Sequence, residues 1–258
     1  MLSWVREFLN LVLPGKCPIC HVDLNTEEGE PPPFCSSCLQ KMIQIAGHGC
    51  PTCGRPLPSR ELLEMNPKFR CGVCRLRQTH LDGAKACFYF AGPVREAIHL
   101  FKYRGYWRLG RGLVRGAVDC MKEVPFEADL ILPVPLDTLR LRRRGFNQAV
   151  VLGRELSKAK GIPMALDLLV RTKRVRPQVG LRGKERLKNI RGCFHVTNPE
   201  RIEGRKVLLV DDVMTTGATA NECARRLKKS GVKSVFLFAV AGAFQLSEEE
   251  SGRDFLSR

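Results

Sequence analysis

The sequence predicts an α/β domain with a mostly parallel sheet flanked by helices, preceded by a small module that binds metal through cysteines. Eight of the 12 cysteines lie in four CxxC pairs before residue 75. After that point, apolar stretches with the length of strands alternate with stretches typical of helices. We expect an N-terminal helix and zinc module over residues 1–75, the α/β domain over 76–245 and a solvated acidic tail over 246–258.

The composition is that of a globular protein that carries a strong positive charge. The chain has 258 residues, a net charge of +17 and 44% hydrophobic residues. No stretch approaches the roughly 18 apolar residues of a membrane span, and Arg6 and Glu7 interrupt the N-terminal apolar run. We therefore expect a cytoplasmic protein. Residues 1–16 predict a short amphipathic helix that packs on its own protein or, alternatively, lies on a membrane surface.

The four CxxC pairs have spacings near those of two zinc ribbons. Within the first block 14 residues separate the pairs, and within the second 17, against roughly 15–20 in known ribbons. Two such knuckles complete a tetrahedron of thiolates around Zn²⁺ and leave no open position, so the two zinc ions are expected to be structural. Four pairs argue against a redox motif, and nothing indicates the secretion that disulfides require. Pairing within each block is favoured, and interleaved pairing stays open. The expected ligands are Cys17, Cys20, Cys35, Cys38, Cys50, Cys53, Cys71 and Cys74.

The first half of the α/β domain begins with a strand and two helices. Residues 85–92 form an apolar run with aromatic side chains, which predicts a strand. Pro93 stands at a suitable first helical position, so we expect a helix over 93–105 and a second helix over 108–123. The apolar run 128–135 predicts a buried strand that prolines end.

The second half continues the alternation of strands and helices. Gly161 and Gly231 each follow a helical stretch whose last turn is rich in lysine, which is typical of helix C-termini. A long basic loop is expected to separate the third strand from the fourth. The expected elements are a helix over 147–161, strands over 166–172 and 206–212, a helix over 217–231 and a strand over 234–242.

The fourth strand carries Asp211 and Asp212 to the carboxyl edge of the sheet, where open α/β sheets bind ligands. The sequence TTGAT then leads into a helix, whose free N–H groups, together with the threonine hydroxyls, form a nest suited to a phosphate monoester. Glycine at 217 allows the backbone to approach that phosphate closely. The expected phosphate-binding residues are Thr215, Thr216, Gly217, Ala218 and Thr219.

With a 5-phosphate held by this nest, Asp211 and Asp212 can accept hydrogen bonds from the ribose 2- and 3-hydroxyls. Their charge also stabilises a ribose that becomes positive as diphosphate leaves, so we expect the pair to be catalytic at a phosphoribosyl diphosphate (PRPP) site. A Walker B strand would need a GxxxxGK[ST] loop, which the chain lacks. A receiver domain places its acidic pair near its beginning, whereas only 46 residues follow Asp212 here.

Residues 207–219, VLLVDDVMTTGAT, resemble the PRPP motif of type I phosphoribosyltransferases. Together with the four CxxC pairs, three further motifs resemble the competence protein F (ComF, GntX-type) family: LFKYRG at 100–105, PVPL with RRRGFNQA over 133–149, and LRGKERLKNIRGCF at 181–194. The resemblance implies a double zinc ribbon followed by a type I phosphoribosyltransferase-like, Rossmann-like domain that binds PRPP with Mg²⁺. It also implies a role in handling incoming DNA. The 6-oxopurine enzymes have aspartate where this chain has Thr215, so the resemblance does not extend to hypoxanthine or guanine as acceptor.

Two basic segments complete the predicted site. Residues 171–191 carry nine Lys and Arg against one Glu, and are expected to form a flap. The four arginines of 140–144 are expected in a diphosphate loop, with Arg143, Arg144 and Gly145 as diphosphate contacts.

The excess of cations leaves two further interpretations open, a solvated face or a groove for single-stranded DNA. Such a groove would stack bases on aromatic side chains, although buried packing is expected for most of those near the site. In that alternative the protein handles DNA with the uptake machinery and keeps PRPP as a regulatory ligand. The sequence leaves open which molecule accepts the phosphoribosyl group, and whether the protein turns PRPP over at all. The aromatic candidates are Tyr103, Tyr106, Trp107, Phe146 and Phe194.

Overall fold

The computed structural model describes residues 15–24, 33–45, 49–107, 109–122, 126–172 and 190–246. The predicted N-terminal helix, most of the basic flap and the acidic tail lie outside these residues. Within them, no helix combines the length and the apolar character needed to cross a membrane.

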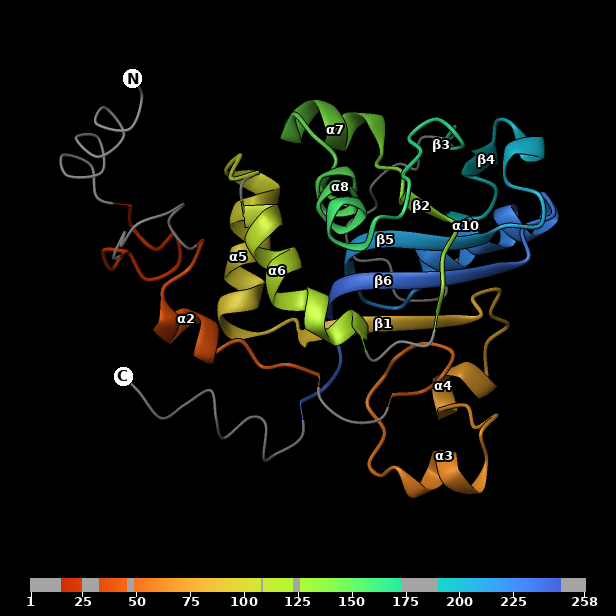
Figure 1. Cartoon of the computed structure of the whole chain (residues 1–258), viewed down its shortest axis with the longest axis horizontal. Helices are drawn as coiled ribbons and strands as arrows, with labels where there is room; N and C mark the ends of the chain where they lie inside the picture. Colours follow the sequence, from red (N-terminus) through yellow and green to blue (C-terminus); the bar gives the residue numbers. More distant parts are fainter. Residues whose placement is uncertain are drawn as a thin grey trace.

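The centre of the protein is a four-stranded sheet in which every pair of neighbouring strands is parallel (Figure 1). Parallel neighbours need a crossover connection, which helices provide here, so the predicted α/β fold is confirmed. The order is β1 (Gly83–Tyr89), β6 (Ser234–Gly242), β5 (Lys206–Met214) and β2 (Leu130–Pro133).

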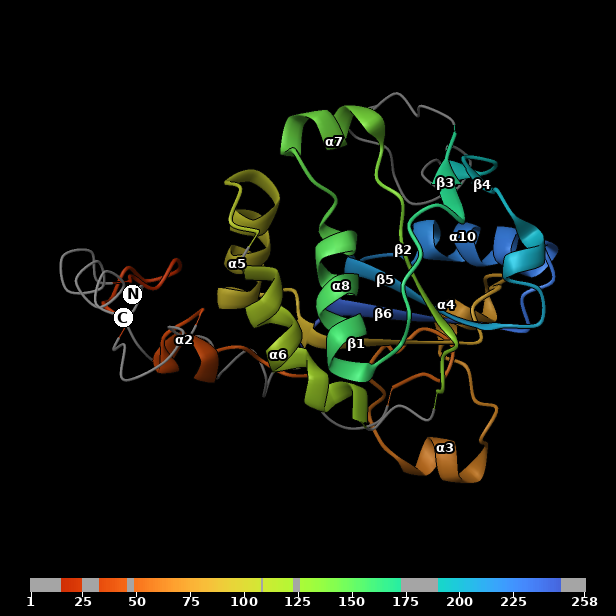
Figure 2. The same cartoon turned by 45° about the horizontal axis from the view of Figure 1, so that its top comes forward.

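Successive residues of β5 alternate between two hydrophobic clusters, one on each face of the sheet. Val207 and Leu209 pack in the cluster that contains α10 (Ala218–Lys229). Leu208 and Val210 pack in the other, which contains three helices that lie side by side (Figure 2). These are α5 (Gly92–Tyr103), α6 (Leu109–Lys122) and α8 (Gln148–Lys160).

Two elements differ from the sequence-based expectation. Residues 140–144 were expected in a loop, and that prediction is wrong, because they belong to α7 (Thr138–Arg144). Asp137 caps this helix by accepting the Leu139 N–H at 3.0 Å, and Gly145 ends it in the left-handed conformation at φ +79°. The third strand, β3 (Leu169–Arg171), lies outside the central sheet and pairs antiparallel with β4 (Phe194–Val196). A short 3₁₀ helix, Pro199–Arg201, follows.

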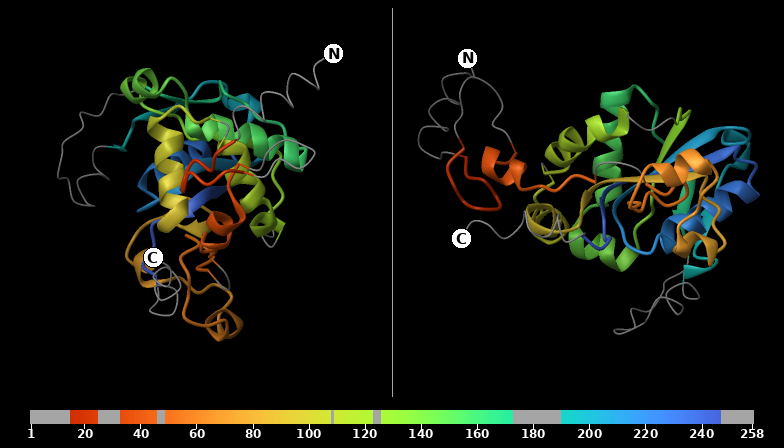
Figure 3. Two further views of the ribbon diagram at one scale, coloured as in Figure 1. Left: turned by 90° about the vertical axis from the view of Figure 1, so that its left-hand side faces the viewer. Right: turned by 90° about the horizontal axis from the view of Figure 1, so that it is seen from below.

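The cysteine-rich region forms two ribbons at separate places around the sheet (Figures 1 and 3). The first contains α2 (Ser36–Gln40), and its residues Cys17, Phe34 and Cys38 are buried in the same cluster as α5 and α6. The second contains α3 (Glu61–Met65) and α4 (Gly72–Arg75), and has a small cluster of its own around Cys50, Cys71 and Cys74.

The segment between the two ribbons extends the sheet beyond β1. The Tyr89 N–H donates to the Ile43 carbonyl at 3.0 Å, and the Ile45 N–H donates to the Cys87 carbonyl at 2.8 Å. At the opposite edge, the Ile131 N–H of β2 donates to the Pro163 carbonyl at 2.8 Å. Both edges of the sheet are thus covered by short segments of the same chain.

Candidate functional site

The eight CxxC cysteines form two compact groups, and in each group the four sulfur atoms lie within 4.8 Å of one another. Cys17, Cys20, Cys35 and Cys38 make the first group, and Cys50, Cys53, Cys71 and Cys74 make the second. The structure therefore pairs the cysteines within each block, as the spacing favoured.

The donor geometry of both groups fits Zn²⁺. Zinc–sulfur bonds of about 2.3 Å in a tetrahedron separate the sulfurs by about 3.8 Å. The observed separations are 3.5 Å between Cys20 and Cys35, and 3.6 Å between Cys53 and Cys71. These are two structural zinc-ribbon sites, since each offers four sulfur ligands.

Backbone donors favour the thiolate form that zinc requires. The Cys38 N–H points to Cys35 Sγ, and the Cys71 N–H points to Cys50 Sγ, both at 3.4 Å. The neighbouring Cys53 thiol, followed by backbone N–H groups that act against burial, lowers the pKa of Cys50 to about 4. In the same group, the hydrogen bond with Cys50 and then burial raise the pKa of Cys53, and burial raises the pKa of Cys74 to about 12. Zinc binding at the second site must therefore release protons from the neighbours of Cys50.

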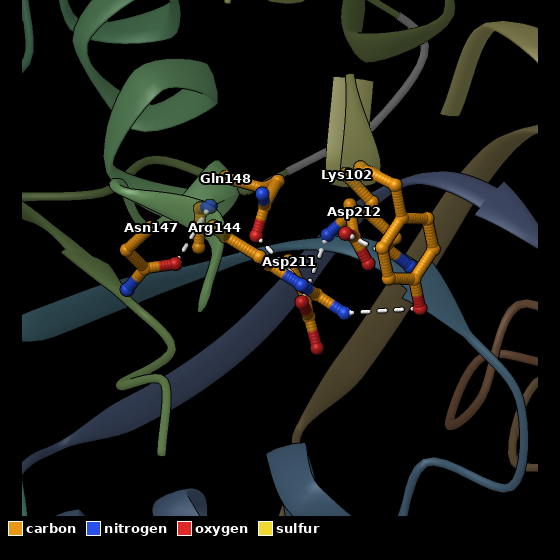
Figure 4. A network of polar contacts seen from close by, with 8 residues as sticks. Lys102, Arg144, Asn147, Gln148, Asp211 and Asp212 are labelled. Carbon is orange, nitrogen blue, oxygen red and sulfur yellow. Dashed lines mark hydrogen bonds and ion pairs between the residues drawn. The ribbon is translucent and has the colours of Figure 1, made fainter. Parts of the chain in front are cut away.

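A second polar site lies where β5 reaches the carboxyl edge of the sheet, and its centre is the acidic pair (Figure 4). Asp212 is buried and forms an ion pair with Lys102 of α5, with Nζ 3.0 Å from Oδ2. Asp211 is half-buried and accepts the Asp212 N–H at 2.9 Å. The two predicted catalytic residues thus lie together but have different partners.

The carboxyl group of Asp211 has an unusual proton affinity. Burial, followed by the charge of Asp212, raises its pKa to about 7, although the Asp212 N–H and the charges of Lys102 and Arg144 act in the opposite direction. This group therefore changes its charge close to neutral pH.

The TTGAT loop leads from β5 into the first turn of α10. Gly217 has φ +70°, a left-handed conformation that favours glycine, and it precedes the first helical residue, Ala218. Thr215 and Thr216 are exposed, and Thr219 is half-buried. The N–H groups at the start of this helix of 12 residues give this end the polarity that suits an anion, and the Ala218 N–H donates to the Thr216 hydroxyl at 3.4 Å.

Of the three predicted diphosphate residues, the structure brings Arg144 to the acidic pair. Its Nη1 donates to Gln148 Oε1 at 2.9 Å and its Nη2 to the Tyr103 hydroxyl at 3.3 Å, and it lies over the Tyr103 ring at 5.0 Å (Figure 4). Arg143 and Gly145 are exposed at the end of α7. Sequence reasoning did not assign Lys102 or Gln148 to the site, although they stand in the motifs LFKYRG and RRRGFNQA. It named Tyr103 only as an aromatic candidate for stacking bases.

The ends of the predicted flap are tied to the same region. Arg171 lies 3.9 Å from Asp137, the cap of α7, and packs over the Phe194 ring at 5.6 Å. On the other side, the Gly192 N–H donates to buried Glu222 of α10 at 2.8 Å. The β3–β4 pair therefore anchors both ends of this segment beside α7 and α10.

The aromatic side chains divide into two groups. Phe194 is buried, and Phe146 packs against Phe101 with ring centres 5.5 Å apart. Tyr103, Tyr106 and Trp107 are 57%, 50% and 58% exposed, so the expectation that most of the five are buried is wrong. Tyr103 is the last residue of α5, and Tyr106 and Trp107 lie on the segment that joins α5 to α6.

Two family models match the chain in regions that agree with this structure. A double zinc ribbon domain matches residues 8–75, and a phosphoribosyl transferase domain matches residues 141–253. With the two four-cysteine sites and the parallel sheet flanked by helices, they define the class: a double zinc ribbon joined to a type I phosphoribosyltransferase-like domain.

Curated relatives identify the family. Competence protein F of Haemophilus influenzae is 31% identical over 216 residues, covering 81% of this chain and 90% of that protein. The DNA utilization protein YhgH of Salmonella typhimurium is 26% identical over 230 residues, covering 87% and 96%. The chain belongs to the competence protein F (ComF) family.

Among solved structures, the glutamine PRPP amidotransferase of B. subtilis complexed with ADP and GMP is 21% identical, with a TM-score of 0.34. The match covers 54% of this chain and 26% of the amidotransferase. At this score the match adds no argument of its own.

Proposed function

We propose that the chain binds PRPP at the carboxyl edge of its parallel sheet. The observation that carries this proposal is the meeting of three features at one edge: the acidic pair, the start of α10 and Arg144. The loop from Thr215 to Thr219 would hold the 5-phosphate, the acidic pair would face the ribose, and Arg144, with Arg143 and Gly145, would hold the diphosphate.

Mg²⁺ would enter this site with the diphosphate. Among the described residues, the groups of three or more side chains able to ligate a metal are the two cysteine clusters, and no acidic group of that size accompanies Asp211 and Asp212. Mg²⁺ keeps several waters and commonly binds substrate phosphates with few protein ligands. The residues present therefore fit an ion carried by PRPP better than a resident ion.

Titration calorimetry with Mg²⁺ and PRPP tests the site. We expect wild type to bind and Asp211→Asn to lose at least about 10-fold in affinity, because a neutral amide replaces the carboxylate acceptor. Asp167→Asn is the matched control, since it removes an exposed carboxylate that pairs with Arg201. No binding by wild type, or equal binding by Asp211→Asn, contradicts the proposal.

If PRPP reacts, an acceptor nucleophile attacks ribose C1, a new bond forms to C1, and the bond from C1 to diphosphate breaks. The acceptor loses a proton, diphosphate leaves with Mg²⁺, and the protein is then a pentosyltransferase within the glycosyltransferases. Release of diphosphate, measured over a panel of nucleobases and single-stranded nucleic acids, decides between transfer and binding alone.

A second candidate function is the handling of single-stranded DNA in the cytoplasm during DNA uptake, with PRPP as a regulatory ligand. Its specific support is the exposed aromatic segment Tyr103–Trp107, which the contact between Arg144 and Tyr103 joins to the exposed arginines of α7. Cations next to aromatic faces are typical of single-strand binding. The names of the curated relatives, competence and DNA utilization, agree with this use.

Fluorescence anisotropy with a labelled oligonucleotide tests this function. We expect affinity to fall steeply as salt rises, and to fall about 10-fold for Trp107→Ala, since stacking on an aromatic side chain stabilises each bound base. The matched control is Leu166→Ala, which truncates an exposed apolar side chain elsewhere. Affinity that is indifferent to salt and to Trp107 contradicts the assignment.

A further inference from the structure

The two aspartates of the acidic pair belong to opposite faces of the sheet. Adjacent residues of a strand point to opposite sides, and β5 alternates in this way from Val207 to Val210. The surroundings of the pair agree: Asp212 pairs with Lys102 of α5, whereas burial and then the charge of Asp211 raise the pKa of Cys223 of α10. Beyond the pair the alternation reverses, since Val213 packs against the cluster of the three helices and Met214 lies in that of α10. Asp211 follows Val207 and Leu209, which pack on the α10 side. Asp212 follows Leu208 and Val210, which pack on the side of α5, α6 and α8.

Asp212 is already engaged by a cation of the protein itself. Its carboxylate is 3.0 Å from Lys102 Nζ, and the two side chains are 11% and 18% exposed. Lys102 follows Phe101, which is buried in the core with the inward face of α5, so the helix fixes where the lysine can reach. A carboxylate paired in this way is satisfied without a ligand.

Tyr103, the next residue of the same turn, contacts the arginine assigned to the diphosphate. Tyr103 meets the Arg144 guanidinium through its hydroxyl at 3.3 Å and through its ring at 5.0 Å. Gln148 accepts from the same guanidinium at 2.9 Å. The last turn of α5 thus contacts both the acidic pair and the arginine assigned to the diphosphate (Figure 4).

We propose that the last turn of α5 is the positioning element of the PRPP site, and that it gives the two aspartates different roles. Lys102 neutralises and fixes Asp212, Tyr103 orients Arg144 toward the diphosphate, and Asp211 is the carboxylate that contacts the ribose hydroxyls. This inference rests on the proposed PRPP site and deepens it. The turn lies outside residues 141–253, which match the transferase domain, as do β1 and β2 of the same sheet.

A double-mutant cycle between Lys102 and Asp212 tests the first part. Lys102→Met leaves a buried carboxylate without its partner, and we expect a lower melting temperature and about 10-fold weaker binding of Mg²⁺–PRPP. Adding Asp212→Asn removes that unpaired charge, and we expect the double variant to recover most of both losses. Asp211→Asn is expected to lose PRPP binding without a fall in melting temperature.

The cycle separates this inference from the proposed function. If wild type binds PRPP and the folded double variant binds no better than Lys102→Met, Asp212 contacts the ligand directly and the roles assigned to the two aspartates are wrong. If wild type does not bind PRPP, the proposed function fails, whereas the rescue of melting temperature still reports on the ion pair.

Tyr103 is tested with a pair of ligands that differ by the diphosphate. We expect Tyr103→Leu to weaken PRPP about 5-fold through the freed Arg144, and to leave the affinity for ribose 5-phosphate unchanged. Tyr103→Phe keeps the ring and is expected to lie between wild type and Tyr103→Leu. Equal losses for both ligands, or none for either, overturn the role assigned to Tyr103.

Discussion

The two zinc ribbons have the same ligands but different relations to the rest of the protein. In the first, Cys17 and Cys38 are part of the core that also contains α5 and α6. In the second, Cys50, Cys71 and Cys74 form a small cluster of their own, with Cys53 and Leu57 packed against it. One metal site therefore shares the hydrophobic core of the transferase-like domain. The other has a cluster of its own and touches that domain at Gly54, beside Ala84 of β1, and at Arg55, over the Phe244 ring. Loss of the first metal should therefore destabilise the domain more than loss of the second.

The largest expected effect comes from removing one ligand of each ribbon. Cys38 and Cys74 are matched in burial, at 4% and 6% exposure. We expect Cys38→Ser to lower the free energy of unfolding of the whole protein by about 3 kcal/mol or more, because loss of the metal loosens the shared core. Cys74→Ser should leave the main thermal transition and PRPP affinity close to those of wild type.

The measurements are metal content, calorimetry and PRPP titration on both variants. Each variant should retain about one zinc per chain, since the other site keeps its four cysteines. Equal falls in the main transition would show that both ribbons are built into the domain, and the comparison would then fail.

Two glycines, one beside each ribbon, test the same comparison of the ribbons with an intermediate expected effect on stability. A Cβ added at Gly112 of α6 would overlap Pro33 of the first ribbon and approach the Phe34 ring at 3.1 Å. We expect Gly112→Ala to destabilise the protein by about 1–3 kcal/mol, because this overlap exceeds the gain in helix propensity. Gly72→Ala, in α4 of the second ribbon, meets open space and should be neutral or slightly stabilising. Thermal unfolding of the pair decides, and equal effects would contradict the asymmetry.

The smallest expected effect is a pH dependence of stability that arises at Asp211, at the carboxyl edge of the sheet, and involves neither ribbon. The pKa of Asp211 is about 7 in the folded protein and about 4 in the unfolded chain, so between these values the folded state binds more protons. The free energy of unfolding should therefore fall as pH rises from about 4 to about 7. We expect Asp211→Asn to remove this slope and to be about 1–2 kcal/mol more stable than wild type at pH 8.

Urea unfolding across this pH range measures the slope, with Asp129→Asn as a control carboxylate at the other end of the sheet. PRPP affinity should change in the opposite sense and strengthen as pH rises through about 7, since the ribose requires the ionised carboxylate. An unchanged slope in Asp211→Asn would place the titrating group elsewhere.

Much of this fold is visible in local sequence patterns. The helices that end before Gly161 and Gly231 were predictable, because the apolar pattern and the glycine agree. In contrast, α7 has no buried residue and hence no apolar periodicity, so its arginines resembled a loop. The split of the ribbons was hidden as well, since the burial of Phe34 depends on contact with a distant helix.

The part of the site whose residues are adjacent in the sequence was predictable. The part whose residues come together only in the folded chain was not. Asp211, Asp212 and the TTGAT loop follow one another in the chain, so their pattern alone indicates a ligand. Lys102 and Tyr103 reach them only because α5 packs on the same face of the sheet as Asp212. No local pattern distinguishes such a lysine from an ordinary solvated one.

The cover on both edges of the sheet has a consequence for solubility. Unpaired strand edges are templates for association between chains, and here Ile43 and Ile45 fill the edge of β1 while Pro163 fills that of β2. Ile43 and Ile45 directly follow the first zinc ribbon, so a chain that loses this metal should expose an apolar β-edge before the domain unfolds. The zinc of the first ribbon would then prevent self-association of the protein through the edge of β1.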